Sequence, residues 1–209
     1  MKAWRLERLG GALRLEDIGV LKARAGGVVV RIDTSSLMSY MKDYADGKLA
    51  IYRTPGGAFA PDGSGVGVAH EAGADVWHLA PGQRVVLSSH VVAQENVAEP
   101  AQILLGITAA GPTTEHLQSY WRDGMLAEFA QWPASAVTLA QELPGVDSTQ
   151  LALSTRFVVP YAACCGAASS SWRWRWVEPR SYPLAEPPAA MEAAAAAGSF
   201  ERVVMQHRQ

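Results

Sequence analysis

Cysteine is nearly absent from this sequence, which has two cysteines in 209 residues, and these two are adjacent, at Cys164 and Cys165. Neighbouring cysteines do not form a strain-free disulfide, so the disulfide framework that holds small secreted domains together is not expected. Long apolar stretches are missing too, because no run of about 18 uncharged apolar residues is available to cross a bilayer. The N-terminal segment MKAWRLERLGG also lacks the apolar centre of a signal peptide. These absences predict a cytoplasmic protein with no membrane partner.

A large excess of either charge is likewise absent. The sequence carries 18 Lys and Arg against 20 Asp and Glu, which gives a formal net charge of -2 and a pI near 6.2. Such a surface has no diffuse positive field that would attract nucleic acid or an anionic membrane. Hydrophobic residues make up 49% of the chain, enough for the core of one large domain or of one domain with an appendage. We therefore expect a globular protein whose partner is a small molecule or another protein.

Short segments rich in β-branched or aromatic residues fill the first 90 residues. Because turns with glycine separate them, they predict an all-β beginning. One of them, VVVRID, alternates with a period of two and predicts a half-buried antiparallel strand. Its buried face would hold Val28, Val30 and Ile32, and its outer face would hold Val29, Arg31 and Asp33.

Helical patterns are fewer. Residues 37–48 carry apolar side chains at helix-like spacing, with a glycine near the end. Asp147 is a suitable N-cap for a second helix that continues until proline intervenes. Residues 187–198 have prolines at the start, alanines within and glycine at the end, which predicts a third helix, and a last strand follows it. Residues 89–124 show little pattern, and we expect a long loop or lobe there.

Several segments resemble the medium-chain dehydrogenase/reductase superfamily, which includes alcohol dehydrogenases and quinone reductases. They occur in the family's order over residues 1 to about 161, and they are MKAW, SYMKDYADG, PDGSGVGV, LAPGQRVV, DGMLAEFAQWPA and LPGVDSTQLALSTRFVVPY. The tail SYPLAEPPAAMEAAAAAGSFERVVMQ resembles the family's last helix and strand. The combination is far more specific than any one of these motifs.

The resemblance implies a mainly β (α+β) fold, the GroES-like, partly open β-barrel of the family's catalytic domain, in residues 1–161. Residues 182–209 would return to this domain, and residues 162–181 would form an irregular junction where the family has its coenzyme-binding domain. A doubly wound sheet is built from strand-helix units of about 30 residues. Because the junction is too short for one such unit, we expect no complete Rossmann domain.

A glycine pattern at Gly63, Gly65 and Gly67 is the nearest approach to a phosphate-binding loop. It lacks the spacing of a dinucleotide fingerprint and leads into strand-like sequence, so a turn or close backbone packing is the simpler interpretation. The family implies NAD(P)H as the cofactor. We predict that its site is absent from this chain and name no cofactor-binding residue.

The family's zinc ligands are not found at the matching positions. Alignment on Asp43 places Tyr40 where the first ligand cysteine would stand, and alignment on Gly67 places Gly63 where the ligand histidine would stand. Neither residue is a normal zinc ligand. A His-Glu pair at residues 70–71 has the wrong spacing for the family's motif, and a solvated or strand-capping histidine explains it better. We predict that no metal is bound, which indicates the zinc-free, quinone-reductase-like branch.

In that branch a hydride passes from nicotinamide to a polarised carbonyl or alkene, and side chains mainly position the substrate. The resemblance places Ser39, Tyr40 and Tyr44 as substrate-binding residues for a small carbonyl, quinone or alkene. Tyr40 is the catalytic candidate, because its hydroxyl could donate a hydrogen bond to the substrate oxygen, or a proton if its surroundings lower its pKa. The alternative is that Tyr40 and Tyr44 pack their rings against the barrel.

The junction contains the unusual stretch CCGAASSSWRWRW. As a strand it would place Trp172, Trp174 and Trp176 on one face, a pattern that stacks on bases in some nucleic-acid-binding proteins. Without a wider basic surface, nucleic-acid binding is not favoured. The preferred hypothesis is a deletion with a shifted reading frame, after which the family's tail resumes.

Two functions stay open from the sequence. The first is the catalytic domain of a zinc-independent, NAD(P)H-dependent oxidoreductase that is inactive alone, because no hydride donor is held near the substrate. The second is a non-catalytic binding or assembly module derived from that domain. In either case the surface left by the missing domain would favour a homo-oligomer.

Overall fold

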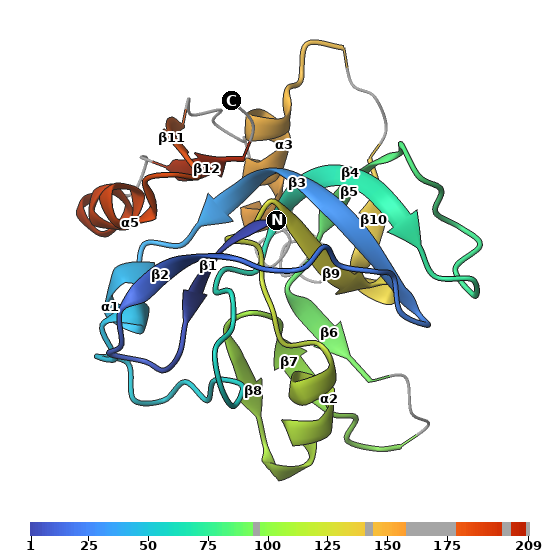
Figure 1. Cartoon of the computed structure of the whole chain (residues 1–209), viewed down its shortest axis with the longest axis horizontal. Coiled ribbons are helices and arrows are strands. Elements are labelled where there is room, and N and C mark those ends of the chain that lie inside the picture. The colour runs from blue at the N-terminus through green and yellow to red at the C-terminus, as the bar shows by residue number, and fades with distance from the viewer. Residues whose placement is uncertain (94–96, 141–143, 158–178, 198–201, 208–209) are drawn as a thin grey trace, which may run out of the picture.

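The computed structural model describes residues 1–93, 97–140, 144–157, 179–197 and 202–207. Within these residues the strands form three sheets, with two, seven and three strands (Figure 1). The two-stranded sheet is the hairpin of β1 (Lys2–Leu6) and β2 (Leu13–Asp17). These sheets make the described structure mainly β, as the sequence predicts. No helix in the described ranges is long and apolar enough to cross a membrane.

The seven-stranded sheet forms the centre of the structure. Its order is β10-β5-β4-β3-β12-β11, and β9 also pairs with β3. The sheet is open, as expected for a partly open barrel. Its strands are β3 (Gly27–Leu37), β4 (Gly65–Ala72), β5 (Arg84–Leu87), β9 (Phe129–Pro133), β10 (Val137–Leu139), β11 (Arg180–Pro183) and β12 (Val203–Gln206).

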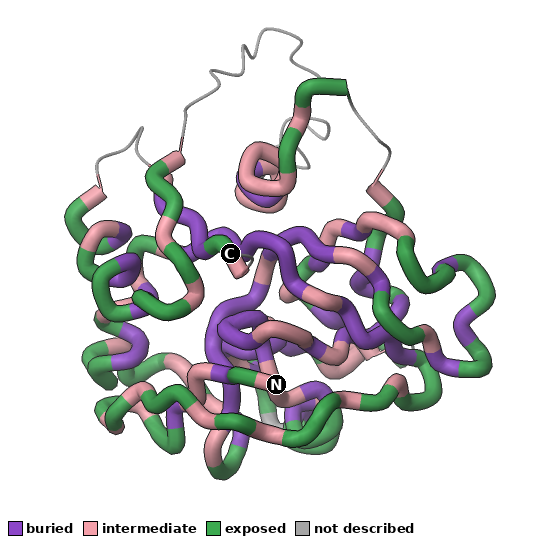
Figure 2. The backbone as a smooth tube through the Cα atoms, turned by 45° about the horizontal axis from the view of Figure 1, so that its top comes forward, coloured by how far each residue is buried: buried purple, intermediate pink, exposed green. Residues whose placement is uncertain are grey.

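Strand β3 is buried along nearly its whole length. Figure 2 shows that buried backbone gathers in the middle of the molecule and exposed backbone at its edge. The prediction of a half-buried strand is wrong here, because Val29 is 0% and Asp33 is 8% exposed; of the expected outer face, Arg31 alone stays partly exposed. For Asp33 the reason is that helix α3 (Ser148–Ser154) packs on β3, where Ser148 Oγ donates a hydrogen bond to Asp33 Oδ2 at 3.3 Å. An antiparallel strand of a sheet covered on both sides does not alternate between core and solvent.

The helices begin and end for local reasons. Helix α1 (Met41–Ala45) is shorter than the expected 37–48, because β3 continues to Leu37. Helix α3 starts at a capping box, in which Asp147 accepts from the backbone N–H of Gln150 at 2.7 Å. Helix α5 (Pro187–Ala196) and strand β12 confirm the predicted last helix and strand.

The weakly patterned residues 89–124 form a small lobe, seen below the main sheet in Figure 1. The lobe contains strands of three residues each, which are too short to show a period of two. The expected lobe is thus confirmed, whereas a structureless loop is not. Its elements are β6 (His90–Val92), β7 (Gln102–Leu104), β8 (Thr108–Ala110), a 3-10 turn (Pro112–Thr114) and α2 (Glu115–Tyr120).

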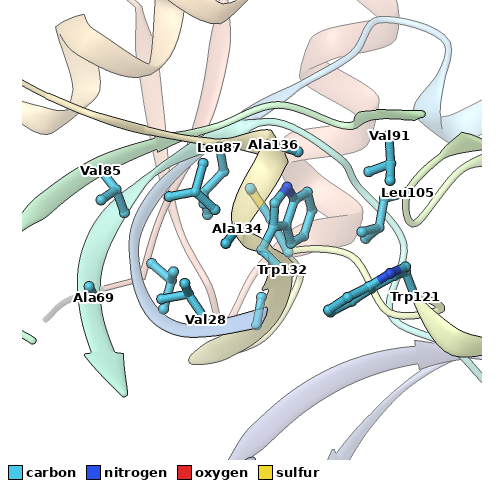
Figure 3. Packing of buried hydrophobic residues seen from close by; sticks show 14 of the residues in the cluster. Val28, Ala69, Val85, Leu87, Val91, Leu105, Trp121, Trp132, Ala134 and Ala136 are labelled. Carbon is cyan, nitrogen blue, oxygen red and sulfur yellow. The ribbon is translucent and has the colours of Figure 1, made fainter. Parts of the chain in front are cut away.

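Trp132 of β9 anchors the core between the sheet and this lobe. Figure 3 shows its indole among Val28, Leu87 and Leu105. The ring is fully buried, and its Nε1–H donates to the Ser88 carbonyl oxygen at 2.7 Å, so its polar atom is satisfied. A second cluster, which includes Tyr44, Phe59 and Met205, joins α1 to α5 and β12.

Gly65 and Gly67 of the glycine pattern lie in β4, where they pack against β3, whereas Gly63 lies in the turn before β4 and faces Ser89 and Leu105. A Cβ atom at Gly67 would lie 2.3 Å from the carbonyl oxygen of Arg31, and one at Gly65 would lie 2.4 Å from that of Thr34. Real Cβ atoms essentially never come this close to backbone. The prediction of close backbone packing is therefore confirmed, and these glycines do not form a turn at a helix start.

The substitution Gly67→Ala should destabilise the protein by about 2 kcal/mol, because the added methyl group must push β4 away from β3. The matched control is Gly19→Ala, where an added Cβ meets nothing within 4 Å and the expected change is within about 0.5 kcal/mol. Urea unfolding of both variants measures the difference. Equal stabilities for the two variants would contradict the close approach of the strands.

Candidate functional site

Three segments meet at the C-terminal end of β3. Strand β3 ends with Ser35, Ser36 and Leu37, and the turn before β4 lies beside it, since the backbone N–H of Ser36 donates to the Ser64 carbonyl oxygen at 2.8 Å. The third segment is the 3-10 turn Thr155–Phe157, which carries Arg156. Its Nε donates to Ser36 Oγ at 2.6 Å, and its Nη2 donates to the Leu37 carbonyl oxygen. The guanidinium therefore ties the end of β3 to the segment after α3.

Asp62 occupies the turn before β4 and is fully buried. Its φ of 77° lies in the left-handed region, which few residues other than glycine adopt. The backbone holds it there, because its carbonyl oxygen accepts from the Met125 N–H at 2.9 Å and a Cβ at Gly124 would lie only 1.8 Å from that oxygen. Asp62 Oδ1 accepts from the Gly63 N–H at 2.9 Å.

The carboxyl of Asp62 titrates near neutrality. Burial raises its pKa to about 7, although hydrogen bonding from Ser35 and the Gly63 N–H and the charge of Arg156 act in the opposite direction. Its Oδ2 is buried and has no hydrogen-bond partner of ordinary geometry. Asp62 therefore exchanges a proton in the pH range where most carboxyls are permanently ionised.

Tyr40 lies at the N-terminus of α1. It is partly buried, and its ring stacks on Tyr52 at 5.8 Å between centroids. Burial first, then the charge and hydrogen bond of Tyr52 and the charge of Asp62, raise the pKa of its phenol. The lowered pKa that proton donation would need is thus not found, and Tyr40 stays a neutral phenol. A hydrogen bond from Tyr40 to a substrate oxygen stays a prediction.

The other two predicted site residues lie in different surroundings. Ser39 is exposed. Tyr44 is 0% exposed, and its hydroxyl donates to the Ile107 carbonyl oxygen at 2.6 Å. Because that hydroxyl is already used in the core, the packing alternative describes Tyr44 better than substrate binding does.

His207 is a further member of the site that the sequence did not indicate. Its Nδ1 lies 3.0 Å from the Ala127 carbonyl oxygen, and its Nε2 lies 3.2 Å from Ser35 Oγ. His207 is among the residues that line a cavity of about 310 Å³, but both of its ring nitrogens contact protein atoms. Burial lowers its pKa to about 4, so the ring is neutral at pH 7.

The donor set does not fit zinc. Among the described residues no three His, Cys, Asp or Glu side chains come together as a metal site would require. Asp62 is a lone carboxyl with the Arg156 cation beside it, which would repel a second cation. Both cysteines and the WRWRW stretch lie outside the residues that the structure describes.

A larger cavity, of about 560 Å³, lies elsewhere, between the lobe and the sheet. Its wall includes Gly26, Val91 and Trp121, and none of the predicted site residues contributes to it. The smaller cavity, in contrast, lies close to the Asp62 cluster, because His207 lines this cavity and its Nε2 lies 3.2 Å from Ser35 Oγ. The cluster of Asp62, Ser35, Arg156 and Tyr40 is therefore the better candidate site.

The substitution Asp62→Asn should change how stability depends on pH. Between the ordinary pKa of 3.8 and about 7 the folded-state carboxyl of Asp62 binds more protons than its unfolded-state counterpart, so the contribution of Asp62 to stability falls as pH rises through this range. Asparagine does not titrate and tolerates a positive φ. The free energy of unfolding of the variant, relative to wild type, should therefore rise by about 1 kcal/mol per pH unit.

Urea unfolding of both proteins at about pH 4, 5, 6 and 7 measures this difference. The opposite contribution of His207, whose pKa is lowered, is common to both proteins and cancels. A difference that does not change with pH would show that Asp62 is ionised throughout.

No family model matches the sequence, and no curated protein matches it. Solved structures do match. An alcohol dehydrogenase from Aeropyrum pernix has a TM-score of 0.60 at 19% identity, over 88% of this chain and 52% of that one. A cobalt- and zinc-bound alcohol dehydrogenase from Pyrobaculum aerophilum has a TM-score of 0.64 at 12% identity, over 99% of both chains.

A quinone oxidoreductase from Thermus thermophilus, solved alone and with NADPH, has a TM-score of 0.50 at 23% identity, over 97% of this chain and 52% of that one. The chain thus spans about half the length of the Aeropyrum and Thermus proteins. The described residues have the fold of the catalytic domain of medium-chain alcohol dehydrogenases and quinone oxidoreductases.

Proposed function

We propose that this chain is the catalytic-domain part of a zinc-independent, NAD(P)H-dependent oxidoreductase that acts on a small carbonyl, quinone or alkene. The observation that carries the proposal is the shared fold, in which Ser39 and Tyr40 follow directly on the central strand β3. The absence of a zinc donor set among the described residues supports zinc independence. The cytoplasmic location and the homo-oligomer stay predictions.

The role proposed for Tyr40 is to orient the substrate. A neutral phenol with a raised pKa keeps its proton and donates a hydrogen bond to the substrate oxygen. Stacking on Tyr52 limits the movement of the ring. Arg156 stabilises the strand end from which this segment leaves, through its bonds to Ser36 and Leu37. When bound, NAD(P)H would supply the hydride.

The described residues do not fit a dinucleotide. Among them no strand is joined to a helix by a turn with more than one glycine, and the glycines at 65 and 67 are packed against β3. A phosphate site of the Rossmann type needs such a turn, with free backbone N–H groups at a helix start. We therefore propose that the chain alone has little or no oxidoreductase activity.

The substitution Tyr40→Phe should weaken the binding of a small enone, such as cyclohexenone, by about 2- to 10-fold, because one neutral hydrogen bond to the carbonyl oxygen is lost. Amide chemical shifts in an NMR titration give the dissociation constant and show where the enone binds. The matched control is Tyr120→Phe, since Tyr120 is 47% exposed on α2. Shifts that spare residues 39–41, or equal affinities for wild type and Tyr40→Phe, would overturn the proposed role of Tyr40.

A further inference from the structure

A third pocket, of about 260 Å³, lies where three segments of the chain meet. The connection between β2 and β3 contributes Arg24 to its wall, the end of α2 and the residues that follow contribute Ser119 and Arg122, and β9 contributes Gln131. None of the residues of the candidate site lines this pocket. Its size admits a small molecule rather than a drug-sized one.

The guanidinium of Arg24 is held in place on one wall of the pocket. Its Nη1 donates to the Tyr120 carbonyl oxygen at 2.6 Å, and its guanidinium carbon lies 5.1 Å from the centroid of the Tyr120 ring. That ring packs edge-on against the buried Trp121, at 5.0 Å between centroids. The bond to Tyr120 uses one of the five N–H donors of an arginine. Arg24 is therefore positioned by the protein and still has donors to offer.

Arg122 brings a second guanidinium to the same pocket. Its Nε lies 3.7 Å from Asp123 Oδ2, which is a long contact for an ion pair, and both side chains are partly exposed. The other oxygen of Asp123, Oδ1, accepts from the Ala60 N–H at 2.9 Å. Within the described ranges the Nη atoms of Arg122 donate to no protein acceptor. Its donors are therefore largely unused.

The groups that line the pocket are rich in positive charge and in donors. Arg24 and Arg122 carry two positive charges against the one negative charge of Asp123. No carboxylate of the described residues lies within 4 Å of the Arg24 guanidinium. The wall also includes the Ser119 hydroxyl and the amide of Gln131, whose Nε2 is buried without a hydrogen-bond partner in the described structure. What this wall lacks is a negatively charged acceptor.

We propose that this pocket binds a small oxyanion, the carboxylate or phosphate group of a low-molecular-weight ligand. A guanidinium donates two parallel N–H bonds to either group, and two guanidinium groups from different segments can hold it from two sides. Leu21 and the half-exposed ring of Tyr120 offer apolar surface to the rest of the ligand. A purely structural role of Arg24, as a cap on the last turn of α2, would explain its bond to Tyr120 but not the unused donors of Arg122. The proposal does not depend on oxidoreductase activity.

Titration of the full chain with inorganic phosphate and with benzoate, at constant ionic strength, tests the site through amide chemical shifts. We expect saturable shifts at residues 24, 119–123 and 131, and none when chloride replaces the probe. Saturation with phosphate alone would identify a phosphate ester as the ligand class, saturation with benzoate alone would identify a carboxylate, and saturation with both would show that the site recognises the shared oxyanion. Shifts that spare these residues, or that do not saturate with either probe, would overturn the proposal.

Three variants separate a built site from diffuse attraction. Arg122→Gln should weaken binding about 5- to 10-fold, because two charge-assisted hydrogen bonds are lost. Asp123→Asn should strengthen it about 2- to 5-fold, because the opposing charge is removed while the amide oxygen can still accept from Ala60. The matched control is Arg8→Gln, which removes the same charge from an exposed residue outside the pocket and should change the affinity less than about 2-fold.

Replacement of Arg122 removes no hydrogen bond within the described structure, and its one ion pair is long, so the variant should stay folded. Urea unfolding checks this directly. Equal weakening by Arg8→Gln and Arg122→Gln would show that only the net charge attracts the anion, and the proposal would be wrong. Weaker binding by a folded Asp123→Asn protein would contradict it as well.

Discussion

The close approach of β3 and β4 is the constraint on which the rest of the structure depends. It is possible because Gly65 and Gly67 have no Cβ, and any side chain there would collide with the carbonyl oxygens of β3. The approach brings the turn before β4 against the end of β3. Asp62 and Ser35 consequently lie in contact inside the protein, more than twenty residues apart in the sequence. The same glycines cannot serve a phosphate group, because their backbone is already packed.

Burying an ionised carboxyl costs free energy, and the surrounding groups determine whether the carboxyl is ionised or protonated in the folded protein. Here one cation, one hydroxyl and one backbone N–H offset only part of the cost, so Asp62 keeps its proton up to about pH 7. The site consequently combines a protonated carboxyl with a neutral phenol and a neutral imidazole. Such a site holds and orients protons, and it offers little to a metal cation.

Local patterns were enough to predict much of the fold. The alternation in the first strands, the capping box at Asp147 and the alanine-rich helix after residue 187 are all signals carried by neighbouring residues. The burial of Asp33 was missed because it depends on α3, which is distant in the sequence. The Asp62 cluster was missed for the same reason, since Ser35 and His207 are 172 positions apart. No local pattern marks Arg156 or His207 as partners of one strand end.

We propose that this chain is the catalytic-domain part of an oxidoreductase and has no site for the nicotinamide cofactor, and binding of that cofactor tests the proposal most directly. The seven tryptophans provide a fluorescence signal, and titration with NADPH and with NADH, corrected for absorbance with free tryptophan, gives the affinity. We predict no saturable quenching at micromolar concentrations of either nucleotide. Saturable micromolar binding of one of them would contradict the account and require a dinucleotide site in this chain.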